Sequence, residues 1–580
     1  MADGSNRLRL EEIDWPAVLP VMKIFGSFRM AIHPSKLGLA LVMIVLLYLW
    51  GSLLDGLFFR SEVYPGERAF HERLMLEPTG DPEVSMAEWR EGVRAKHIQV
   101  IESVLRGKYS EAAPNGAFRM ELEQAKIAKV TGSLEPYTRA LGAVNQAFQD
   151  AVEEDADDLE EQYEDRLFFV QKIKELKPRG IFVAAMEHKL AGLNQLVQAA
   201  VNLDFGVGEL LPGTLGYTVA GGETGRTSVV GALKQLIIVL PGWLYTHYFG
   251  FLLIYGIGAF LLWALFGGAI ARLAALHATR DERVTAVDAV GYGAKRWLWF
   301  IMAPLIPLIF ALLIGLFMAI GGLVFFNLEV LEWVGGLLFF LALGAGLVIT
   351  VLLIGLVGGY NLLYPSVAIE GTDAFDAISR AYNYVLGRPW RTVFYNAVAL
   401  VYGAITYIFL TVVVYVTLVV THQTAGMFVW RAKYGVNRFD AMLPEPSIGS
   451  LLGSVDWYGL NWSAKIAGTF VCLWAWLLVA LLVAFAISYY FSASTWIYLL
   501  LRRVADGTEY DDVHLSADEH EAGEDNSVQA DVGTTVAVEA TSTRSTGPAQ
   551  AGSDMEAEGD QPPTSDKEED EKRDSDGGAP

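Results

Sequence analysis

The sequence contains a single cysteine, Cys472, among its 580 residues. Because Cys472 has no partner and lies within an apolar run, neither a disulfide framework nor a thiolate metal site can form. The nine histidines include no helical His-Glu-x-x-His pair and no visible cluster of ligands. We therefore predict no metal-binding and no cofactor-binding residues.

Charged side chains are absent from deep within the long apolar runs of the C-terminal half. Six runs of the chain approach or exceed the ~20 residues that a helix needs to cross the hydrocarbon core. These runs are Leu37–Leu54, His247–Ile270, Trp297–Gly322, Gly335–Gly359, Val393–Val420 and Ile466–Tyr490. Proton-coupled carriers keep costly charged groups at mid-depth, so their absence from the last five runs disfavours such transport. The sequence predicts a mostly α, polytopic helical membrane protein with six spans.

The formal net charge of −23 is distributed unevenly. Residues 505–580 hold 22 acidic and 4 basic residues, residues 61–230 hold 28 and 18, and the remainder carries a net charge of +5. The acidic balance thus indicates neither an acidic substrate nor a nucleic-acid partner. Residues 505–580 are also poor in aromatics, a composition that cannot offset the entropy of ordering. We predict a disordered acidic cytoplasmic tail.

The N-terminal run has no small-residue cleavage site after it, so we interpret residues 37–59 as a permanent signal anchor that follows a cytoplasmic segment, 1–36. Lysine and arginine in the short connections set the orientation. They gather in the N-terminal segment, in the second-to-third and fourth-to-fifth connections, and after the last span. The connection 421–464, with Arg431, Lys433 and Arg438, is mild counter-evidence. The balance predicts that both termini lie in the cytoplasm and that residues 60–230 lie outside.

Residues 229–246 are also apolar but include Lys234, Pro241 and Gly242. Together with the next run, they are too long for one helix and too short for two with a turn. We expect an interfacial helix that bends into the bilayer at Pro241, because proline removes a helix hydrogen bond. A re-entrant seventh span is the alternative.

Residues 60–228 are predicted to form a helical extracytoplasmic domain. The composition predicts helices over Glu88–Lys108, Ala117–Lys129 and Glu135–Asp150. The acidic run from Glu153 to Asp165 lacks the alternating ligands and central glycine of an EF-hand loop, so a solvated face or hinge is the better interpretation. After this run, apolar residues recur at helical spacing and form one apolar stripe. The stripe needs a partner, which is another helix of the domain, a neighbouring subunit or the membrane surface. Its members are Leu190, Leu193, Val197 and Ala200.

The sequence from Ala220 to Thr227 is close to a phosphate-binding loop. The first glycine of that motif is alanine here, its lysine is Arg226, and no hydrophobic strand clearly precedes it. We therefore interpret this segment as a flexible approach to the membrane.

The membrane domain, residues 229–504, contains two parallel units, 247–322 and 335–420. In each, a glycine pair ends a span, a short amphipathic segment follows, and a basic-aromatic anchor opens the return span. The segments are Ala286–Val290 and Ala374–Ile378, and the anchors are Lys295–Trp297 and Arg388–Arg391. Both units start in the same direction, so the repeat is parallel rather than inverted.

Five segments carry a resemblance to known proteins. Residues 364–370 (YPSVAIE), 376–382 (DAISRAY) and 388–391 (RPWR) resemble a pattern of bacterial multi-pass proteins similar to the membrane domain attached to some glycerophosphodiester phosphodiesterases. Residues 267–272 (GGAIAR) and 303–307 (APLIP) resemble uncharacterised planctomycete membrane proteins. The resemblance covers roughly residues 230–505. It implies a helical membrane module and no catalytic residues, because the phosphodiesterase activity belongs to a separate soluble domain.

Polar residues near the span ends are the remaining candidates for chemistry. Helix–helix hydrogen bonding explains them at least as well as a substrate path does. They are Tyr360, Asn361, Tyr364, Asn396, Ser488, Tyr489 and Tyr490, together with the scattered carboxylates Glu329, Glu332 and Glu370. A lipid-directed enzyme would need a clustered site, so we predict no catalytic residues.

The leading hypothesis is a non-enzymatic scaffold in contact with membrane lipids. It would bind a protein partner through residues 60–228 or through the acidic tail. The alternative is a carrier or channel for a neutral or lipidic substrate, with the repeat as its scaffold.

The loop charges generate a topology prediction. Reporter fusions at Asp150 and Asp440 should report an outside location, and fusions at Asp288 and Asp376 an inside location, because basic connections stay in the cytoplasm. A cytoplasmic reading at Asp150 would overturn this orientation.

Overall fold

The computed structural model describes residues 19–57, 62–76, 85–105, 135–153, 159–202, 204, 228–280, 285–328, 331–429, 432–433, 436–447, 451–453, 455, 457 and 460–514. The chain forms two units, Met1–His514 and Leu515–Pro580. The second unit lies outside the described residues.

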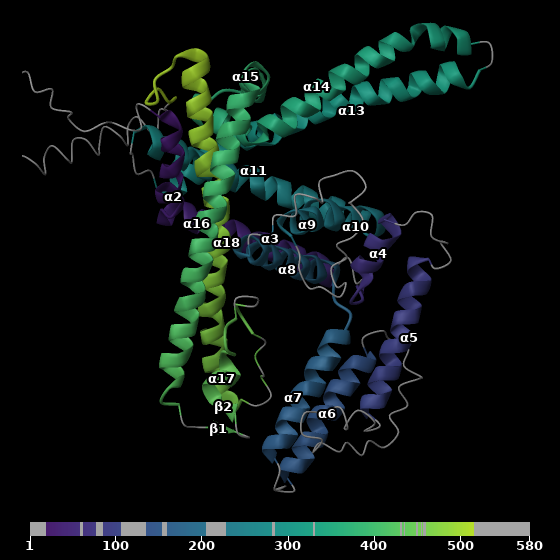
Figure 1. Cartoon of the computed structure of the whole chain (residues 1–580), viewed down its shortest axis with the longest axis vertical. Helices are drawn as coiled ribbons and strands as arrows, with labels where there is room; N and C mark the ends of the chain where they lie inside the picture. The colour runs from purple at the N-terminus through teal and green to yellow at the C-terminus, as the bar shows by residue number, and fades with distance from the viewer. Residues whose placement is uncertain are drawn as a thin grey trace, which may run out of the picture. The chain divides into compact units, whose positions relative to one another are not determined.

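The helices that precede the membrane domain are η1 (Pro20–Phe25), α2 (Gly26–Ala31), α3 (Pro34–Leu57), α4 (Glu67–Leu76), α5 (Met86–Leu105), α6 (Glu135–Glu153), α7 (Leu159–Leu176) and α8 (Ile181–Val201). Those that follow are α9 (Val229–Lys234), η5 (Gln235–Val239), α10 (Leu240–His247), α11 (Phe249–Thr279), α12 (Ala286–Lys295), α13 (Trp297–Phe326), α14 (Glu332–Glu370), α15 (Ala374–Gly387), α16 (Pro389–Gly426), α17 (Arg438–Met442) and α18 (Trp462–Asp506) (Figure 1). Two short strands, β1 (Ala432–Lys433) and β2 (Val436–Asn437), pair antiparallel.

The predicted fold class is confirmed: the chain is a mostly α, polytopic helical membrane protein. Among the described residues, seven helices are long and apolar enough to cross a membrane. Six of them correspond to the six predicted spans, although the second starts at Phe249 rather than at His247, and the seventh, Val229–His247, is the least apolar. Three helices continue well past the predicted spans, α11 to Thr279, α14 to Glu370 and α18 to Asp506. These extensions bring the ends of the three helices together.

The helix does not end at Pro241, the site of the predicted bend. The helix runs from Val229 through Pro241 to His247, and the chain breaks at Tyr248, whose φ is −138° and ψ 41°. Pro241 stands at the start of α10, directly after the π-helical turn η5. A π turn loosens the hydrogen-bond ladder, which leaves room for a residue that donates no backbone hydrogen bond.

Helix α8 has a helical partner, which it contacts through Gly192 rather than through the predicted apolar stripe, whose first member, Leu190, is 38% exposed. A Cβ on Gly192 would meet the side chain of Leu236 in η5, and the carbonyl of Asp204 accepts the N–H of Val229 at 2.9 Å. α8 therefore forms an antiparallel hairpin with α9 and η5. At its other end, the Asp55 carboxylate of α3 accepts the N–H groups of Phe182 and Val183. An acidic group at a helix N-terminus satisfies otherwise unpaired donors and the helix dipole.

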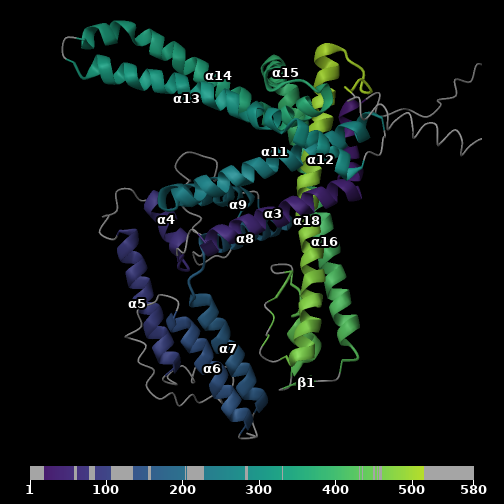
Figure 2. The same ribbon diagram turned by 180° about the vertical axis from the view of Figure 1, so that it is seen from behind.

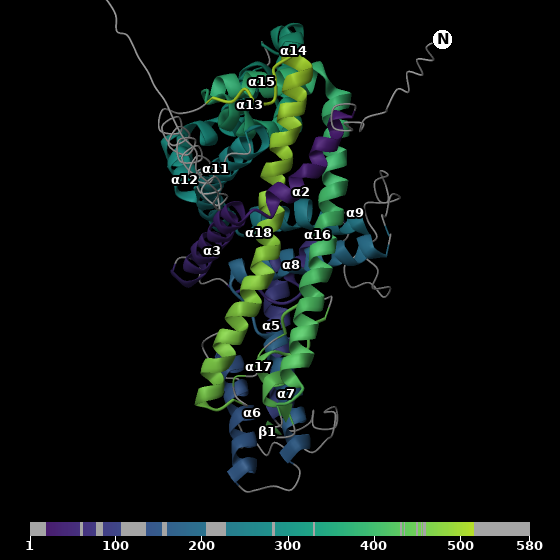
Figure 3. The ribbon, with the colours of Figure 1, turned by 90° about the vertical axis from the view of Figure 1, so that its left-hand side faces the viewer.

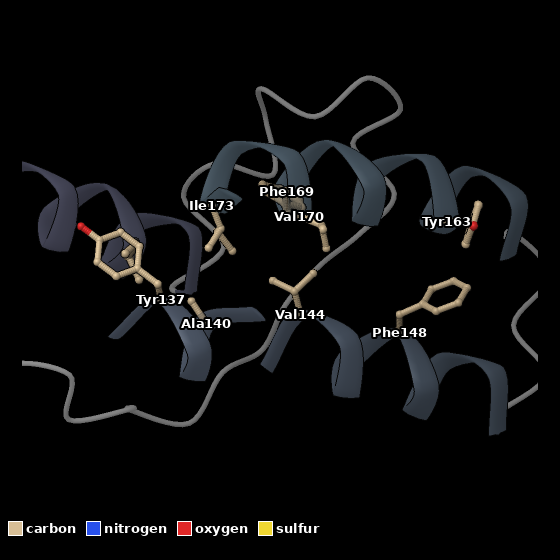
Figure 4. Packing of buried hydrophobic residues seen from close by; sticks show 9 residues of the cluster. Tyr137, Ala140, Val144, Phe148, Tyr163, Phe169, Val170 and Ile173 are labelled. Atoms are coloured by element: carbon tan, nitrogen blue, oxygen red, sulfur yellow. The ribbon is translucent and has the colours of Figure 1, made fainter. Parts of the chain in front are cut away.

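Helices α5, α6 and α7, called the three-helix unit below, enclose a hydrophobic core of their own (Figure 4). Its buried residues are Ile101, Tyr137, Ala140, Val144, Phe148, Tyr163, Phe169, Val170 and Ile173. The predicted helices Glu88–Lys108 and Glu135–Asp150 correspond to α5 and α6, whereas Ala117–Lys129 lies outside the described residues.

The two units of the repeat have the same element order: long helix, short helix, long helix. They are α11–α12–α13 and α14–α15–α16, and α13 and α14 form a long hairpin (Figure 2). Each short helix begins with a side-chain cap that binds the backbone N–H three residues later. In α12 the Thr285 side chain accepts the N–H of Asp288, and in α15 the Asp373 side chain accepts the N–H of Asp376. Small residues meet at matching places, Gly293 against Ala269 and Ala381 against Gly359. The glycine pairs differ, since Gly267 and Gly268 face the rings of Phe491 and Phe300.

Helices α16 and α18 lie side by side (Figure 3), joined where the Tyr489 hydroxyl donates to the carbonyl of Ala399 at 2.7 Å. The N-terminal helices η1 and α2 pack on this pair. The Ser488 hydroxyl donates to the carbonyl of Ala31 at 2.8 Å, and the Tyr402 hydroxyl to that of Phe25 at 3.1 Å. The segment before the first span is thus part of the membrane domain's packing.

The caps generate a prediction about Asp288 and Asp376. Replacing either with Asn should lower stability by a few tenths to about 1 kcal/mol, because an exposed carboxylate in the first turn interacts favourably with the helix dipole. The loss should be larger for Asp376→Asn, since Asp376 also lies 3.0 Å from Nε of Arg380. Thermal unfolding in detergent measures both. A variant that folds normally but loses all function would instead mark a catalytic carboxylate.

Candidate functional site: a buried charged cluster at the ends of three spans

Glu370, the last residue of α14, is the centre of a buried charged cluster. Its carboxylate lies 2.9 Å from Nε of Arg502 in α18, and it accepts a hydrogen bond from the Tyr498 hydroxyl at 2.8 Å. Arg380 of α15 lies 3.8 Å away. The side chains of Arg502 and Glu370 are only 6% and 10% exposed. A buried carboxylate needs such compensation, because unpaired charge is costly to desolvate.

Arg502 also binds the segment that follows α18. Its Nη1 donates to the carbonyl of Asp512 at 2.6 Å, and its Nη2 to the Asp512 carboxylate at 3.1 Å. The N–H of His514 donates to the carbonyl of Ile369 at 3.0 Å. The predicted tail boundary at residue 505 therefore falls within packed structure, since α18 ends at Asp506 and residues 507–514 dock on the end of α14.

Arg272 of α11 is fully buried and binds the same two segments. Its Nη1 donates to the carbonyl of Ala368 at 2.5 Å and its Nη2 to the carbonyl of His514 at 2.8 Å. The guanidinium also lies 4.5 Å from the ring centre of Tyr292, whose hydroxyl donates to the carbonyl of Val367. One side chain thereby joins α11, α12, α14 and the C-terminal segment, using the forked donors of arginine.

Gly371 ends α14 in the left-handed conformation, with φ at 64°. Its carbonyl accepts a hydrogen bond from Arg296, and a Cβ at this position would overlap the ring of His514. Glycine is required here for both the backbone conformation and the close approach.

Tyr384 extends the cluster toward the end of α18. Its hydroxyl donates to the Asp506 carboxylate at 2.5 Å. Burial, followed by the neighbouring Asp506, raises the pKa of the Tyr384 phenol above its usual value. The phenol therefore stays protonated at neutral pH and serves as a hydrogen-bond donor.

The cluster is arranged to hold helix ends together rather than to transfer protons. The Glu370 carboxylate is engaged by a phenol and an arginine, so it is not poised as a general base. Among the described residues, no group of three histidine, cysteine or acidic side chains could hold a metal ion.

Most of the polar candidates from the sequence bond between helices. Asn361 of α14 donates to the Asn396 side chain of α16 at 2.7 Å, and Ser488 and Tyr489 donate to backbone carbonyls of α2 and α16. These contacts match the expected role of polar side chains in helix packing. Tyr364 differs: its hydroxyl is buried without a hydrogen-bond partner.

The structure separates the other candidates. Glu332 starts α14, at the opposite end from Glu370, whereas Glu329 and residues 220–227 lie outside the described residues. Asp165, the last residue of the acidic run, and the following Arg166 are buried, and Nε of Arg166 donates to Asn145 at 2.9 Å. These candidates do not converge on one place.

The sequence alone predicts no buried role for Arg272 or Arg502. A signal of burial was present for Arg272, because it stands alone in the apolar, alanine-rich stretch Ala269–Ala275. A helix that is apolar on all sides is buried, and an arginine within it needs partners.

Comparison with protein-family models, with curated proteins and with solved structures gave no match. The resemblance to bacterial membrane modules stays a prediction.

Replacement of Glu370 tests the cluster. Glu370→Gln should destabilise the chain by about 3–5 kcal/mol, because removing one partner of a buried ion pair leaves uncompensated charge. The matched control is Glu332→Gln on the same helix, where the side chain is exposed and the loss should be below about 0.5 kcal/mol. Thermal unfolding in detergent measures both, and equal losses would contradict the ion-pair assignment.

The docked segment generates a second test. Deleting residues 515–580 should leave the unfolding temperature unchanged, since that region has no apolar periodicity. Deleting residues 507–580 should lower it by several degrees, because Arg272 and Arg502 then lose their partners at His514 and Asp512. Equal stability of the two truncated chains would show that residues 507–514 do not contribute.

Proposed function

We propose that this chain is a non-enzymatic scaffold of a bacterial cytoplasmic membrane, with both termini in the cytoplasm, that binds a protein partner through its three-helix unit. The observation that carries the proposal is the separate hydrophobic core of α5, α6 and α7. A second core, built from α3, α8, α10 and α11, stabilises the membrane domain without it. The three-helix unit thus adds a folded surface that the membrane helices do not need for their own packing.

The outward faces of α6 and α7 are suited to a polar, reversible interface. Gln146 and Asp150 on α6 are exposed, and on α7 Lys172 lies 3.6 Å from Glu175 with both side chains about half exposed. Exposed ion pairs of this kind contribute little stability. They remain available to pair with charges of a partner, where they set specificity and association rate more than affinity.

The carrier hypothesis retains support from one observation, the parallel repeat with its matching helix caps. Repeats of this kind occur in transporters with a binding site at the repeat interface. Against it, the polar side chains of Asn361 and Asn396 both belong to the second unit, and they bond to each other. The scaffold is therefore the preferred proposal.

Site-specific photo-crosslinking in intact cells tests the scaffold. A photoreactive residue at Gln146 should give an adduct of one discrete mass, because this side chain points away from the core of the three-helix unit. The control position is Met427, which is 70% exposed at the end of α16 and is predicted to lie on the same side of the membrane. A Val144→Asp change should abolish the Gln146 adduct by unfolding the unit, since Val144 is fully buried.

Equal labelling from both positions, or an adduct that survives Val144→Asp, would contradict the scaffold. Proteoliposomes address the alternative. Flux of a neutral solute, or lipid scrambling above empty liposomes, combined with a negative crosslink, would favour the carrier.

A further inference from the structure

A second buried cluster lies where α4 meets the break between α10 and α11. Glu67 is fully buried, and its carboxylate accepts hydrogen bonds from Arg90 of α5 at 2.6 and 3.0 Å. The Tyr248 hydroxyl donates to the same carboxylate at 2.8 Å and accepts from Arg90 at 2.8 Å. This closed set joins α4 and the three-helix unit to the membrane helices.

A pair of histidines lies one helical turn further along α4. Nδ1 of His71 is 3.1 Å from Nε2 of His247 at the end of α10, with ring centres 5.0 Å apart. His71 is 3% exposed, and its Nε2 is buried without a hydrogen-bond partner. A hydrogen bond between two imidazoles requires one acceptor nitrogen. If both rings are protonated, two N–H groups and two positive charges face each other across this contact.

We propose that His71 and His247 form a pH-sensitive latch, whose protonation releases α4 and the three-helix unit from the membrane helices. The proposal goes beyond the scaffold function and does not depend on it. No metal or small ligand is involved; the signal is the proton concentration on the side of the membrane where α4 lies.

The surrounding groups favour release over a new ion pair. Glu67, on the same helix as His71, is already engaged by Arg90 and Tyr248, so it offers little further compensation to a protonated His71. Arg90 of α5 adds positive charge nearby. Arg68 of α4 contacts His188 of α8; burial and Arg68 lower the pKa of His188 to about 4. His188 therefore stays neutral over the range in which the latch would open.

The direction of the pH dependence follows from His71. Burial, and then the neighbouring His247, lower the pKa of His71 below its ordinary value near 6.5, while Glu67 opposes the shift. The released state therefore binds more protons than the latched state once the pH falls below about 6.5. By linkage, the latch is fully stable above this pH and weakens as the pH falls toward the lowered pKa.

Hydrogen exchange of the full chain in detergent tests the latch, with rates corrected for the intrinsic pH dependence. Protection of backbone amides in α4 should fall between pH 7.5 and 5.5, by up to about tenfold per pH unit for each proton bound. The double variant His71→Gln/His247→Gln should show no such fall. The control is His422→Gln, a histidine 3.2 Å from Asp440 elsewhere in the chain, which should behave as the unaltered protein.

Protection of α4 that is independent of pH, or an equal fall in the double variant, would overturn the proposal. A second measurement needs no variant. Exchange of the imidazole C2 proton, followed by mass spectrometry, reports the titration of each histidine, and His71 should titrate below 6.5. A midpoint at or above 6.5 for His71 would equally overturn the latch.

Discussion

The structure depends on the cost of removing arginine from water. A buried guanidinium is penalised by several kcal/mol unless its donors are satisfied, and Arg272 is fully buried while Arg502 is nearly so. Both find partners at one place, the end of α14 and the segment that follows α18. This requirement fixes where α11, α14 and α18 must end relative to one another. It also makes residues 507–514 part of the membrane domain.

The same constraint relates the two units of the repeat. Arg272 and Arg296, from the first unit, bind the carbonyls of Ala368 and Gly371 at the end of the first helix of the second unit. The two units are therefore joined by hydrogen bonds to backbone groups rather than by apolar packing alone. Within a bilayer, apolar side chains gain little by leaving lipid for protein, so polar contacts and close packing have to hold helices together. The hydrogen bonds of Arg272 and Arg296 therefore hold the two units together at the end of α14.

The sequence was sufficient to predict the features that segment length and hydropathy determine, namely the membrane spans and the order of the helices. Each of the six predicted spans corresponds to a long apolar helix, and the two amphipathic segments of the repeat form the short helices α12 and α15. The sequence was insufficient to predict features that depend on neighbouring turns or on contacts between distant side chains. At Pro241 the sequence did not reveal the adjacent π turn, after which the helix continues to His247. Glu370 pairs with Arg502, which lies more than a hundred residues further along the chain. Asp512 reaches Arg502 because the chain reverses after α18. A local sequence pattern predicts neither contact.

The central claim is that Glu370 and Arg502 are held together as a buried pair at the convergence of the three helices. A double-mutant cycle with Glu370→Gln and Arg502→Gln, measured by unfolding in detergent, tests it most directly. A coupling energy of about 1–3 kcal/mol is predicted, because the second substitution removes a charge that the first has already left unpaired. Effects that add to within about 0.5 kcal/mol would contradict the claim.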